Sequence, residues 1–355
     1  MKALIAMSGG VDSSVSALLM KQAGYECVGC TMRLYDNEMI GEDLHSTCCS
    51  QKDLRDALAV TLKLGIPYYV FRYEKEFCEE LIEPFVRAYE EGRTPNPCIE
   101  CNRIFKFGHL AGKMEELGCD VIVTGHYARI GQDPDSGRRL LRKGLDPSKD
   151  QSYVLYTMTQ EELAHTRFPL GTLTKEEVRR IAEENAFLNA GKHDSQDICF
   201  VPDGDYAGFM ERYRGAEYPE GNFIDQAGHV LGRHKGYVRY TVGQRRGLGI
   251  PAEHPLYVLE VRPADNTVVL GRDEELYRRE LVADRVNLIS VERLDGPMRV
   301  LAKIRYRHKE QPATVYPEGE DRIRVIFDEP QRAITAGQAV VLYQDDVVVG
   351  GGVII

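Results

Sequence analysis

The feature that most constrains this chain is an apolar run that passes through a glycine-rich loop into an amphipathic helix near the start of the sequence. The pattern predicts a buried strand over Lys2–Met7, a turn at the S-G-G of residues 8–10, and a helix from Val11 onward. Glycines let the backbone approach a ligand closely, and the N–H groups and dipole of a helix start favour an anion. The sequence therefore predicts a phosphate site at this loop.

The residues of the loop indicate which phosphate chemistry it serves. A Walker loop requires G-x-x-x-x-G-K-[ST], and no such stretch occurs in the chain. Instead S-G-G-V-D-S, Ser8–Ser13, resembles the pyrophosphate loop of N-type ATP pyrophosphatases, which cleave ATP to AMP and pyrophosphate and activate a carbonyl oxygen as its adenylate. The alternative is an ordinary Gly-Gly turn capped by Asp12 or a serine. The place of the motif between a strand and a helix favours the phosphate loop.

Length and composition set the broad class. With 355 residues, the chain is long enough for two to three domains. No apolar run reaches membrane-spanning length and Met1-Lys2 leads straight into strand sequence, so we expect a cytoplasmic protein with no membrane partner. Nine cysteines in such a chain favour thiol chemistry or metal binding over a disulfide framework. The net charge of −10 does not exclude a polyanionic partner, because such binding follows local basic clusters.

Alternating strands and helices predict an α/β domain with a doubly wound, mostly parallel sheet over residues 1–205. After the first unit, the predicted strands are Glu26–Leu34, Tyr68–Phe71 and Cys119–Thr124. The predicted helices are Gln51–Leu64, about Lys75 to Glu90, and Thr174 to about Glu184, which begins with a capping box. Residues 133–139 are predicted to form a hairpin-like excursion.

Beyond residue 205 the pattern changes to short β-like runs, which predict small barrels or sandwiches. The predicted strands are Tyr237–Val242, Leu256–Arg262, Thr267–Gly271, Leu281–Leu288, Met298–Tyr306, Ala313–Tyr316, Arg322–Phe327, Ala339–Tyr343 and Val347–Ile354. We therefore expect three domains: a catalytic domain over 1–205, a small central domain over 206–276, and a C-terminal β-barrel over 277–355.

Cysteines in a G-R-T-P-N-P-C-I-E-C-N stretch form the second chemical motif. The P-N-P turn fixes the backbone before Cys98, and C-x-x-C places Cys98 and Cys101 on one side of a loop or helix start, where a thiol pKa is lowered. Cys199 falls in a strand-like run over His193–Val201, and a solitary cysteine there is more often core than catalyst. The adjacent Cys48 and Cys49 fit an exposed loop better than a metal site.

Several polar and basic groups are candidates for binding. Gly125 and His126 follow a buried strand, where a parallel sheet presents its ligands, which favours a ligand contact over a core histidine. One basic cluster comprises Arg233, His234, Lys235, Arg239, Arg245 and Arg246. A second, Lys303, Arg305, Arg307 and Lys309, alternates along one predicted strand and would project from one face. RNA contact and a solvated surface explain each cluster equally well.

Taken together, these motifs resemble the bacterial tRNA-specific 2-thiouridylase family, which replaces the 2-oxygen of the wobble uridine by sulfur. The matching stretches span nearly the whole chain: A-M-S-G-G-V-D-S-S, G-R-T-P-N-P-C-I-E-C-N, T-G-H-Y-A-R, K-D-Q-S-Y, S-Q-D-I-C-F, Y-T-V-G-Q-R-R-G-L-G-I, R-Y-R and G-G-G-V-I. The resemblance implies an adenine nucleotide alpha hydrolase-like catalytic domain and a central domain that contacts tRNA.

The resemblance also implies roles for individual residues. ATP would be held by Ala6, Met7, Ser8, Gly9, Gly10, Val11, Asp12, Ser13, Met32 and Gly125. The nucleophile would be Cys101, and Cys199 would carry the persulfide. The segment facing the target base would be Asn96, Pro97 and Cys98. Further tRNA contacts would come from His126, Lys149, Asp150, Gln151, Arg305, Tyr306 and Gln338.

The implied reaction uses ATP and Mg²⁺ to adenylate the uridine oxygen, and sulfur then displaces AMP. In one common version of the family the position of Cys98 is an aspartate. Its replacement creates a set of three cysteines, Cys98, Cys101 and Cys199, which would also suit an iron–sulfur cluster. The persulfide and cluster routes both stay open, with the persulfide slightly favoured for the family as a whole.

Two other functions are compatible with part of the sequence. A pyrophosphatase-family synthetase that adenylates a small molecule would explain the phosphate loop, but not the cysteines or the β domains. A zinc-stapled RNA-binding module would use Cys98 and Cys101 and leave the phosphate loop without a role. The resemblance to the thiouridylase family implies tRNAs of the Lys, Glu and Gln type as substrates and a sulfur-donor protein or sulfide source as a partner, and we expect a monomeric enzyme.

Overall fold

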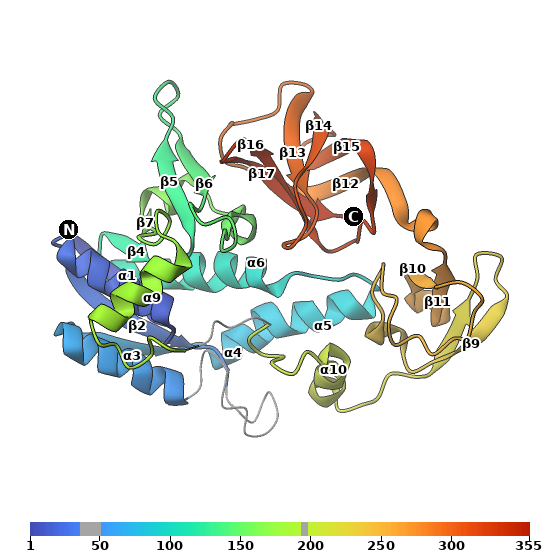
Figure 1. Ribbon diagram of the computed structural model, residues 1–355, viewed down its shortest axis with the longest axis horizontal. Helices are drawn as coiled ribbons and strands as arrows, with labels where there is room; N and C mark the ends of the chain where they lie inside the picture. The colour runs from blue at the N-terminus through green and yellow to red at the C-terminus, as the bar shows by residue number, and fades with distance from the viewer. Residues whose placement is uncertain (36–50, 193–197) are drawn as a thin grey trace.

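The computed structural model describes residues 1–35, 51–192 and 198–355, and its strands form three sheets (Figure 1). The first sheet is parallel, in the order β3-β2-β1-β4-β7. Its strands are β1 (Lys2–Ala6), β2 (Glu26–Arg33), β3 (Tyr68–Arg72), β4 (Val121–Val123) and β7 (Thr166–Arg167). Because β2 lies on one side of β1 and β4 on the other, the strand order reverses at β1, and its carboxyl end opens onto the crevice where such sheets bind ligands.

Helices cover both faces of this sheet, which confirms the doubly wound prediction. On one face the apolar sides of α1 (Val11–Gln22), α3 (Gln51–Leu64) and α9 (Lys175–Glu184) pack on β1 and β4 in one buried cluster. On the other face α7 (Leu110–Glu116) packs on β1, β2 and β4. The inner strands β1, β2 and β4 are therefore mostly buried, as their continuous apolar runs require, whereas the edge strand β3 stays partly exposed.

Two long helical segments contain π-helical turns. The segment predicted over Lys75 to Glu90 consists of α4 (Glu74–Phe77), the π-helix η1 (Cys78–Ile82) and α5 (Glu83–Glu90). Pro84, which has no N–H to donate to the preceding turn, is the second residue of α5. The next segment consists of α6 (Pro97–Cys101), the π-helix η2 (Asn102–His109) and α7. Both C-x-x-C cysteines thus lie on α6, next to a wide turn of a kind often found at functional sites.

The central domain follows α10 (Tyr206–Arg214) and contains a four-stranded sheet in the order β10-β11-β8-β9. Its strands are β8 (Gly221–Ile224), β9 (Val230–His234), β10 (Tyr257–Arg262) and β11 (Thr267–Gly271). The strand predicted over Tyr237–Val242 is wrong, because this segment begins with the 3₁₀ helix η4 (Tyr237–Arg239). The Tyr237 hydroxyl donates to the Glu90 carbonyl at 2.9 Å and Val238 is buried in the adjoining core, so tertiary contacts hold the segment out of the sheet.

The C-terminal domain is a closed six-stranded antiparallel barrel, as predicted. Its strands are β12 (Tyr277–Leu288), β13 (Met298–Lys303), β14 (Gln311–Pro317), β15 (Arg322–Arg332), β16 (Ala339–Gln344) and β17 (Val347–Ile354), and β12 pairs with β17 to close it. The prediction that Lys303, Arg305, Arg307 and Lys309 alternate along one strand is wrong. β13 ends at Lys303, and a turn closed by a 3.0 Å bond from His308 N to the Arg305 carbonyl follows.

A hairpin from the first domain joins the barrel. β5 (Ala128–Gln132) and β6 (Arg139–Lys143) flank the predicted excursion, and β6 pairs with β17 through Arg142 and Val347. Arg129 and Arg142 each donate to Asp346 at 2.8 Å. The barrel is thereby fixed against the first domain, above α6 in Figure 1, with the central domain at the far end.

The remaining short helices complete the chain. They are η3 (Ser152–Leu155), α8 (Gln160–Ala164), η5 (Pro263–Asp265) and η6 (Asp273–Leu276). None of the helices in the described ranges is long and apolar enough to cross a membrane.

Candidate active site at the carboxyl edge of the parallel sheet

The loop between β1 and α1 is shaped by backbone conformation and by its own serines. Gly9 has φ +73°, and a Cβ at this position would lie 2.4 Å from the Asp53 carbonyl oxygen. Ser13 Oγ accepts from Ser8 N at 3.2 Å and donates to the Gly10 carbonyl at 3.0 Å. Gly10 occupies the N-cap of α1 and supplies no side-chain cap, which leaves the amino end of the helix open toward an anion.

A buried lysine neutralises the carboxylate of the loop. Lys175 Nζ lies 2.8 Å from both Asp12 oxygens, and the Tyr127 hydroxyl donates to Asp12 Oδ1 at 2.8 Å. Lys175 is 8% exposed. It is the first residue of α9, after the capping box at Thr174 that the sequence predicted. The carboxylate therefore adds little net negative charge to the phosphate loop.

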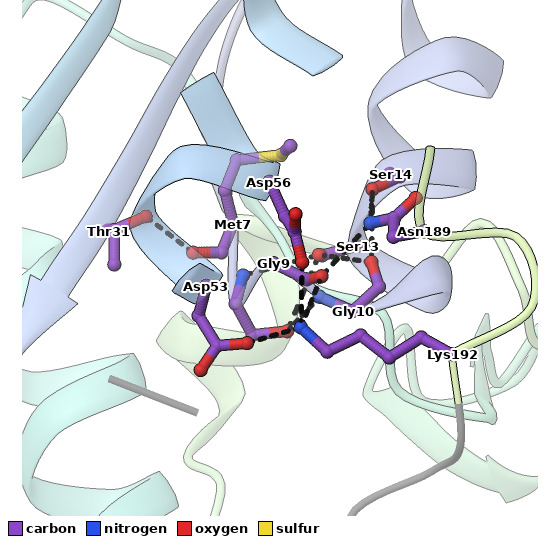
Figure 2. Close-up of polar contacts among 11 residues, drawn as sticks. Met7, Gly9, Gly10, Ser13, Ser14, Thr31, Asp53, Asp56, Asn189 and Lys192 are labelled. Atoms are coloured by element: carbon purple, nitrogen blue, oxygen red, sulfur yellow. Dashed lines mark hydrogen bonds and ion pairs between the residues drawn. The ribbon is translucent and has the colours of Figure 1, made fainter. Parts of the chain in front are cut away.

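A second lysine lies on the other side of the loop (Figure 2). Lys192 Nζ donates to the Gly9 carbonyl at 3.1 Å, to Asp56 Oδ2 at 3.0 Å and to Asp53 Oδ1. Asn189 Nδ2 also donates to the Gly9 carbonyl, at 3.0 Å. These contacts join the start of α3 and the segment before residue 193 to the phosphate loop.

Gly125 brings the end of β4 against the loop. A Cβ at Gly125 would lie 3.0 Å from Ser13 N and from atoms of Asp12, so only glycine allows this approach without a shift. Met32 lies near the carboxyl end of β2, at the same edge of the sheet. The residues predicted to bind ATP therefore gather at the crevice where the strand order reverses.

His126 follows Gly125 and is buried. Its Nδ1 lies 2.7 Å from Thr124 Oγ1, and its Nε2 lies 3.4 Å from Lys106 Nζ. Burial, and to a lesser degree the Lys106 charge, hold the His126 pKa well below its usual value. The ring is therefore neutral at neutral pH and accepts from Lys106. A tRNA contact by this side chain stays a prediction.

The C-x-x-C motif is presented at a helix start. Asn96 is the N-cap of α6, and its side chain accepts from Cys98 N at 3.1 Å. Cys98 is exposed, whereas Cys101 is half-buried. Cys98 thus occupies the position at which the helix dipole favours a thiolate.

Cys199 lies near the same core as Cys101. Both residues pack against one buried cluster that includes Tyr35 and Phe200, and the Tyr35 hydroxyl donates to the Cys199 carbonyl at 3.0 Å. The predicted strand over His193–Val201 is wrong for its described part, since residues 199 and 200 form a turn closed by a bond from Val201 N to the Ile198 carbonyl. Phe200 and Val201 are both buried, which a half-buried strand with alternating faces does not allow.

Two further predictions concern cysteines: the exposed loop at Cys48 and Cys49, and the iron–sulfur cluster. Cys48 and Cys49 lie outside the described residues, as do residues 193–197. Within residues 1–35, 51–192 and 198–355, no three His, Cys, Asp or Glu side chains are arranged to hold a metal ion. In this structure the cysteine trio of the cluster hypothesis is therefore not gathered as a ligand set.

The barrel brings Tyr306 to the edge of the first domain. Burial raises the Tyr306 pKa, and electrostatic interactions with Asp150 and then Cys98 raise it further. The Tyr306 hydroxyl donates weakly to the Asp150 carbonyl at 3.4 Å, and Lys303 Nζ lies 5.7 Å from the ring centre. The phenol of Tyr306 is thus held against Asp150 and Tyr153 at the junction of the two domains.

Contacts from the barrel also hold the loop before α6. Gln338 Nε2 donates to the Thr94 carbonyl at 2.8 Å, and Thr94 N donates to the Ala336 carbonyl at 2.9 Å. Gly337 has φ +90°, and a Cβ there would lie 2.9 Å from Thr94 N. The C-terminal domain therefore fixes where Asn96 and Cys98 lie.

Family models match the chain in three parts. They are described as the tRNA methyl transferase HUP domain (residues 1–203), the tRNA methyl transferase PRC-barrel domain (207–272) and the aminomethyltransferase beta-barrel domain (278–354). The chain is 49% identical over 353 residues to the tRNA-specific 2-thiouridylase MnmA of Clostridioides difficile, covering 99% of this chain and 98% of that protein. It belongs to the tRNA-specific 2-thiouridylase family. The protein of the same name from Lachnoclostridium phytofermentans is 48% identical over 357 residues, covering 100% of this chain and 99% of that protein.

The residues predicted to contact tRNA are of two kinds: some lie in the turn after β13, and others are half-buried and bond to the backbone. Arg305 and Tyr306 lie in the turn after β13, and Tyr306 is 39% exposed. Asp150 and Gln151 are half-buried and bond to the backbone: the carboxylate of Asp150 accepts from Gly144 N at 3.0 Å, and Gln151 Oε1 accepts from Tyr127 N at 3.0 Å. Contacts of Lys149, Asp150 and Gln151 with tRNA stay predictions.

The basic cluster of the central domain is smaller than the sequence suggested. His234 is 1% exposed, and Arg239 donates to both Glu211 oxygens at 2.7 Å. The exposed cations of the cluster are Arg233, Lys235, Arg245 and Arg246. Of this cluster, only these four side chains are candidates for RNA contact.

Sequence reasoning missed most of the residues that support the loop. In the sequence, Lys175 is recognisable only as part of a capping box. No motif includes the other supporting residues, which are Asp53, Asp56, Asn189 and Lys192. The nearest sequence signal was the stretch of polar residues before Cys199, which includes Asn189 and Lys192. Only the fold brings that stretch to the phosphate loop.

Proposed function

We propose that this chain catalyses the ATP-dependent 2-thiolation of the wobble uridine in tRNAs of the Lys, Glu and Gln type, in the cytoplasm. The proposal is carried by one observation: an open phosphate loop and a C-x-x-C helix occur in one fold that matches, over its whole length, relatives named tRNA-specific 2-thiouridylase. A donor protein transfers sulfane sulfur to Cys199, or a sulfide source supplies hydrosulfide that adds directly to the adenylated base. The enzyme acts as a monomer.

The first step activates the base. The uridine 2-oxygen attacks the α-phosphorus of ATP, pyrophosphate leaves, and the base becomes an O-adenylate. The loop N–H groups at residues 9–13 bind the phosphates, because the amino end of α1 is uncapped and Asp12 is neutralised by Lys175. Adenylation is needed because the oxygen leaves far more readily as part of AMP than as hydroxide.

The second step delivers sulfur. The Cys101 thiolate attacks the Cys199 sulfur of a Cys199 persulfide, and hydrosulfide leaves with the electron pair of the broken S–S bond. Hydrosulfide then adds to C2 of the base, and AMP departs with the former oxygen. The two cysteines are left as a disulfide, which a cellular thiol reduces before the next turnover. Packing of both cysteines on one core cluster supports this pairing.

The proposal includes Mg²⁺ and gives no role to an iron–sulfur cluster. Mg²⁺ would neutralise charge on the departing pyrophosphate; Asp12 and Asp53 each pair with a lysine, so the phosphate oxygens themselves are its expected ligands. An iron–sulfur cluster on Cys98, Cys101 and Cys199 does not fit the arrangement of the described residues, and we derive no step through it. Anaerobic purification followed by an iron and sulfide assay tests that route directly.

A single incubation tests the proposed reaction against its alternatives. The purified protein is mixed with unmodified glutamate tRNA, ATP and sulfide, and the tRNA is examined for 2-thiouridine. Thiolation with release of AMP is expected. Release of AMP only with a small amide or amino acid would instead identify a small-molecule synthetase, and RNA binding without ATP cleavage would identify a zinc-stapled binding module.

A further inference from the structure

The Gly9 carbonyl is held by two side chains that come from the far end of the first domain. Asn189 Nδ2 lies 3.0 Å from this oxygen and 2.9 Å from Ser14 Oγ, and Lys192 Nζ lies 3.1 Å from it. Asn189 is 4% exposed, and its own Oδ1 has no hydrogen-bond partner within the described ranges. Leaving a buried oxygen without a partner costs free energy. The contacts of Asn189 Nδ2 with the loop therefore determine the orientation of this side chain, and a contact of Oδ1 does not.

The orientation of this carbonyl sets the direction of the next amide. In a trans peptide the C=O and the following N–H point in opposite directions. The Gly9 carbonyl faces Asn189 and Lys192, so the Gly10 N–H faces the opposite way. In the part of the chain that the structure describes, this N–H makes one long bond, of 3.4 Å, to Ser8 Oγ. It is therefore available to a phosphate oxygen.

Charge gives Lys192 a second role at the loop. Asp53 is 4% exposed and lies at the start of α3, directly against Gly9, and Asp56 lies one turn further along. Burial would lower the Lys192 pKa, but its hydrogen bonds to Asp53 and Asp56 outweigh burial and raise it. The ammonium therefore stays charged at neutral pH. Without it, two carboxylates would repel the phosphates of a bound nucleotide.

We propose that Lys192 is a positioning residue of the phosphate loop, anchored by Asp53 and Asp56. Its ammonium holds the Gly9 carbonyl away from the nucleotide so that the Gly10 N–H faces the phosphates, and it offsets the nearby negative charge. The inference rests on the proposed use of ATP and assigns the effect to the β- and γ-phosphates. AMP, which lacks those phosphates, depends less on Lys192.

Direct binding measurements on the full chain test this role. ATP, inorganic pyrophosphate and AMP are titrated separately into the wild-type protein and into Lys192→Gln by calorimetry. We expect ATP and pyrophosphate to bind at least about tenfold more weakly to Lys192→Gln, because a charge-assisted bond and a compensating charge are lost. AMP affinity should change less than about threefold. Lys192→Arg, which keeps the charge, should bind ATP within about threefold of wild type.

A matched control separates loop positioning from simple tethering. Lys63 also extends from α3 to the segment before residue 193, where its Nζ donates to the Ala186 carbonyl at 2.9 Å, but it does not reach the loop. Lys63→Gln should leave the affinities for all three ligands unchanged. An equal loss of ATP affinity in Lys63→Gln and Lys192→Gln would overturn the proposal, as would equal losses of ATP and AMP affinity in Lys192→Gln.

A second variant covers the case in which Lys192→Gln does not fold. Asp56→Asn removes one of the two carboxylates that anchor Lys192 and keeps the ammonium itself, so ATP and pyrophosphate should bind more weakly than in wild type while AMP binds as in wild type. Equal losses of ATP and AMP affinity in Asp56→Asn, or unchanged affinities for all three ligands, would overturn the inference. If the wild-type protein itself does not bind ATP, the proposed function fails; if it binds ATP and Lys192→Gln binds it equally well, only the role of Lys192 fails.

Discussion

The phosphate loop and the cysteine region lie in the same domain but are built differently. The loop is fixed by side chains from three distant segments, through Asp53, Lys175 and Lys192. The cysteines sit instead at the edges of elements: Cys98 is exposed at the start of α6, and Cys199 lies in a turn after residues 193–197. Phosphate binding benefits from groups that are already in place, whereas sulfur transfer requires two sulfur atoms to meet and separate.

The largest expected effect is a complete loss of thiolation without a loss of adenylation. With a sulfane-sulfur donor, Cys101→Ser and Cys199→Ser should each abolish 2-thiouridine formation, because a serine oxygen neither carries nor exchanges sulfane sulfur. Adenylate formation should survive in both variants, since the proposal assigns nucleotide binding to the phosphate loop and not to these cysteines. The measurement follows AMP-adduct formation on the tRNA and thionucleoside content in parallel. If adenylation disappeared as well, the two regions would not be separable in the way proposed.

A change at Gly9 should disable the nucleotide region. Gly9→Ala places a Cβ against the Asp53 carbonyl and requires a residue other than glycine to adopt φ +73°, so we expect ATP binding to fall by more than about a hundredfold. The free energy of unfolding should also fall, by about 1–2 kcal/mol for the left-handed backbone alone. Calorimetric titration and denaturant unfolding give the two values.

Gly24→Ala is the matched control for that prediction. Gly24 has φ +83°, but nothing lies within 4 Å of a Cβ built there. It should show the backbone cost without the loss of ATP binding. Equal effects of the two substitutions on ATP affinity would mean that close packing against Asp53 has no part in shaping the loop.

Removing the charge of Lys175 should weaken the same region by a smaller amount. Lys175→Met leaves Asp12 with the Tyr127 hydroxyl but no cation, and we expect a loss of about 2 kcal/mol in unfolding free energy, less than for a fully buried pair because Asp12 is partly exposed. Weaker ATP binding should accompany it. Lys113→Met, which breaks an exposed pair with Glu116, should leave both quantities near wild type.

The smallest expected effect concerns acid stability. His126 has a folded-state pKa well below its ordinary value, mainly because of burial and then because of Lys106. The unfolded chain therefore binds more protons, and the stability from neutral His126 is complete above about pH 6.5 and is lost as pH falls toward the folded pKa. Denaturant midpoints at about pH 7.5 and 5.5 measure this loss. Lys106→Met should make it shallower; a steeper loss would contradict the assigned cause.

Local patterns predicted most of the elements but not where some of them end. The first strand, the helix that follows it, and the α3 and α9 helices carry strong apolar periodicity and were predicted closely. The strand predicted at Tyr237–Val242 failed because Tyr237 bonds to α5 instead of to a neighbouring strand. The strand through Lys303 was predicted too long, because nothing in the side-chain alternation signals that its pairing partners stop there.

The sequence by itself determined the class of chemistry. S-G-G-V-D-S between a strand and a helix specifies an anion loop, since glycine conformation and helix-start N–H groups are local properties. The tertiary structure alone decided what supports that loop, because Asp53, Lys175, Asn189 and Lys192 reach it from 44 (53 − 9) to 183 positions away. It also decided that the barrel turn at Tyr306 lies against Asp150 and Tyr153 of the first domain. Such contacts depend on how domains pack, and no local pattern encodes them.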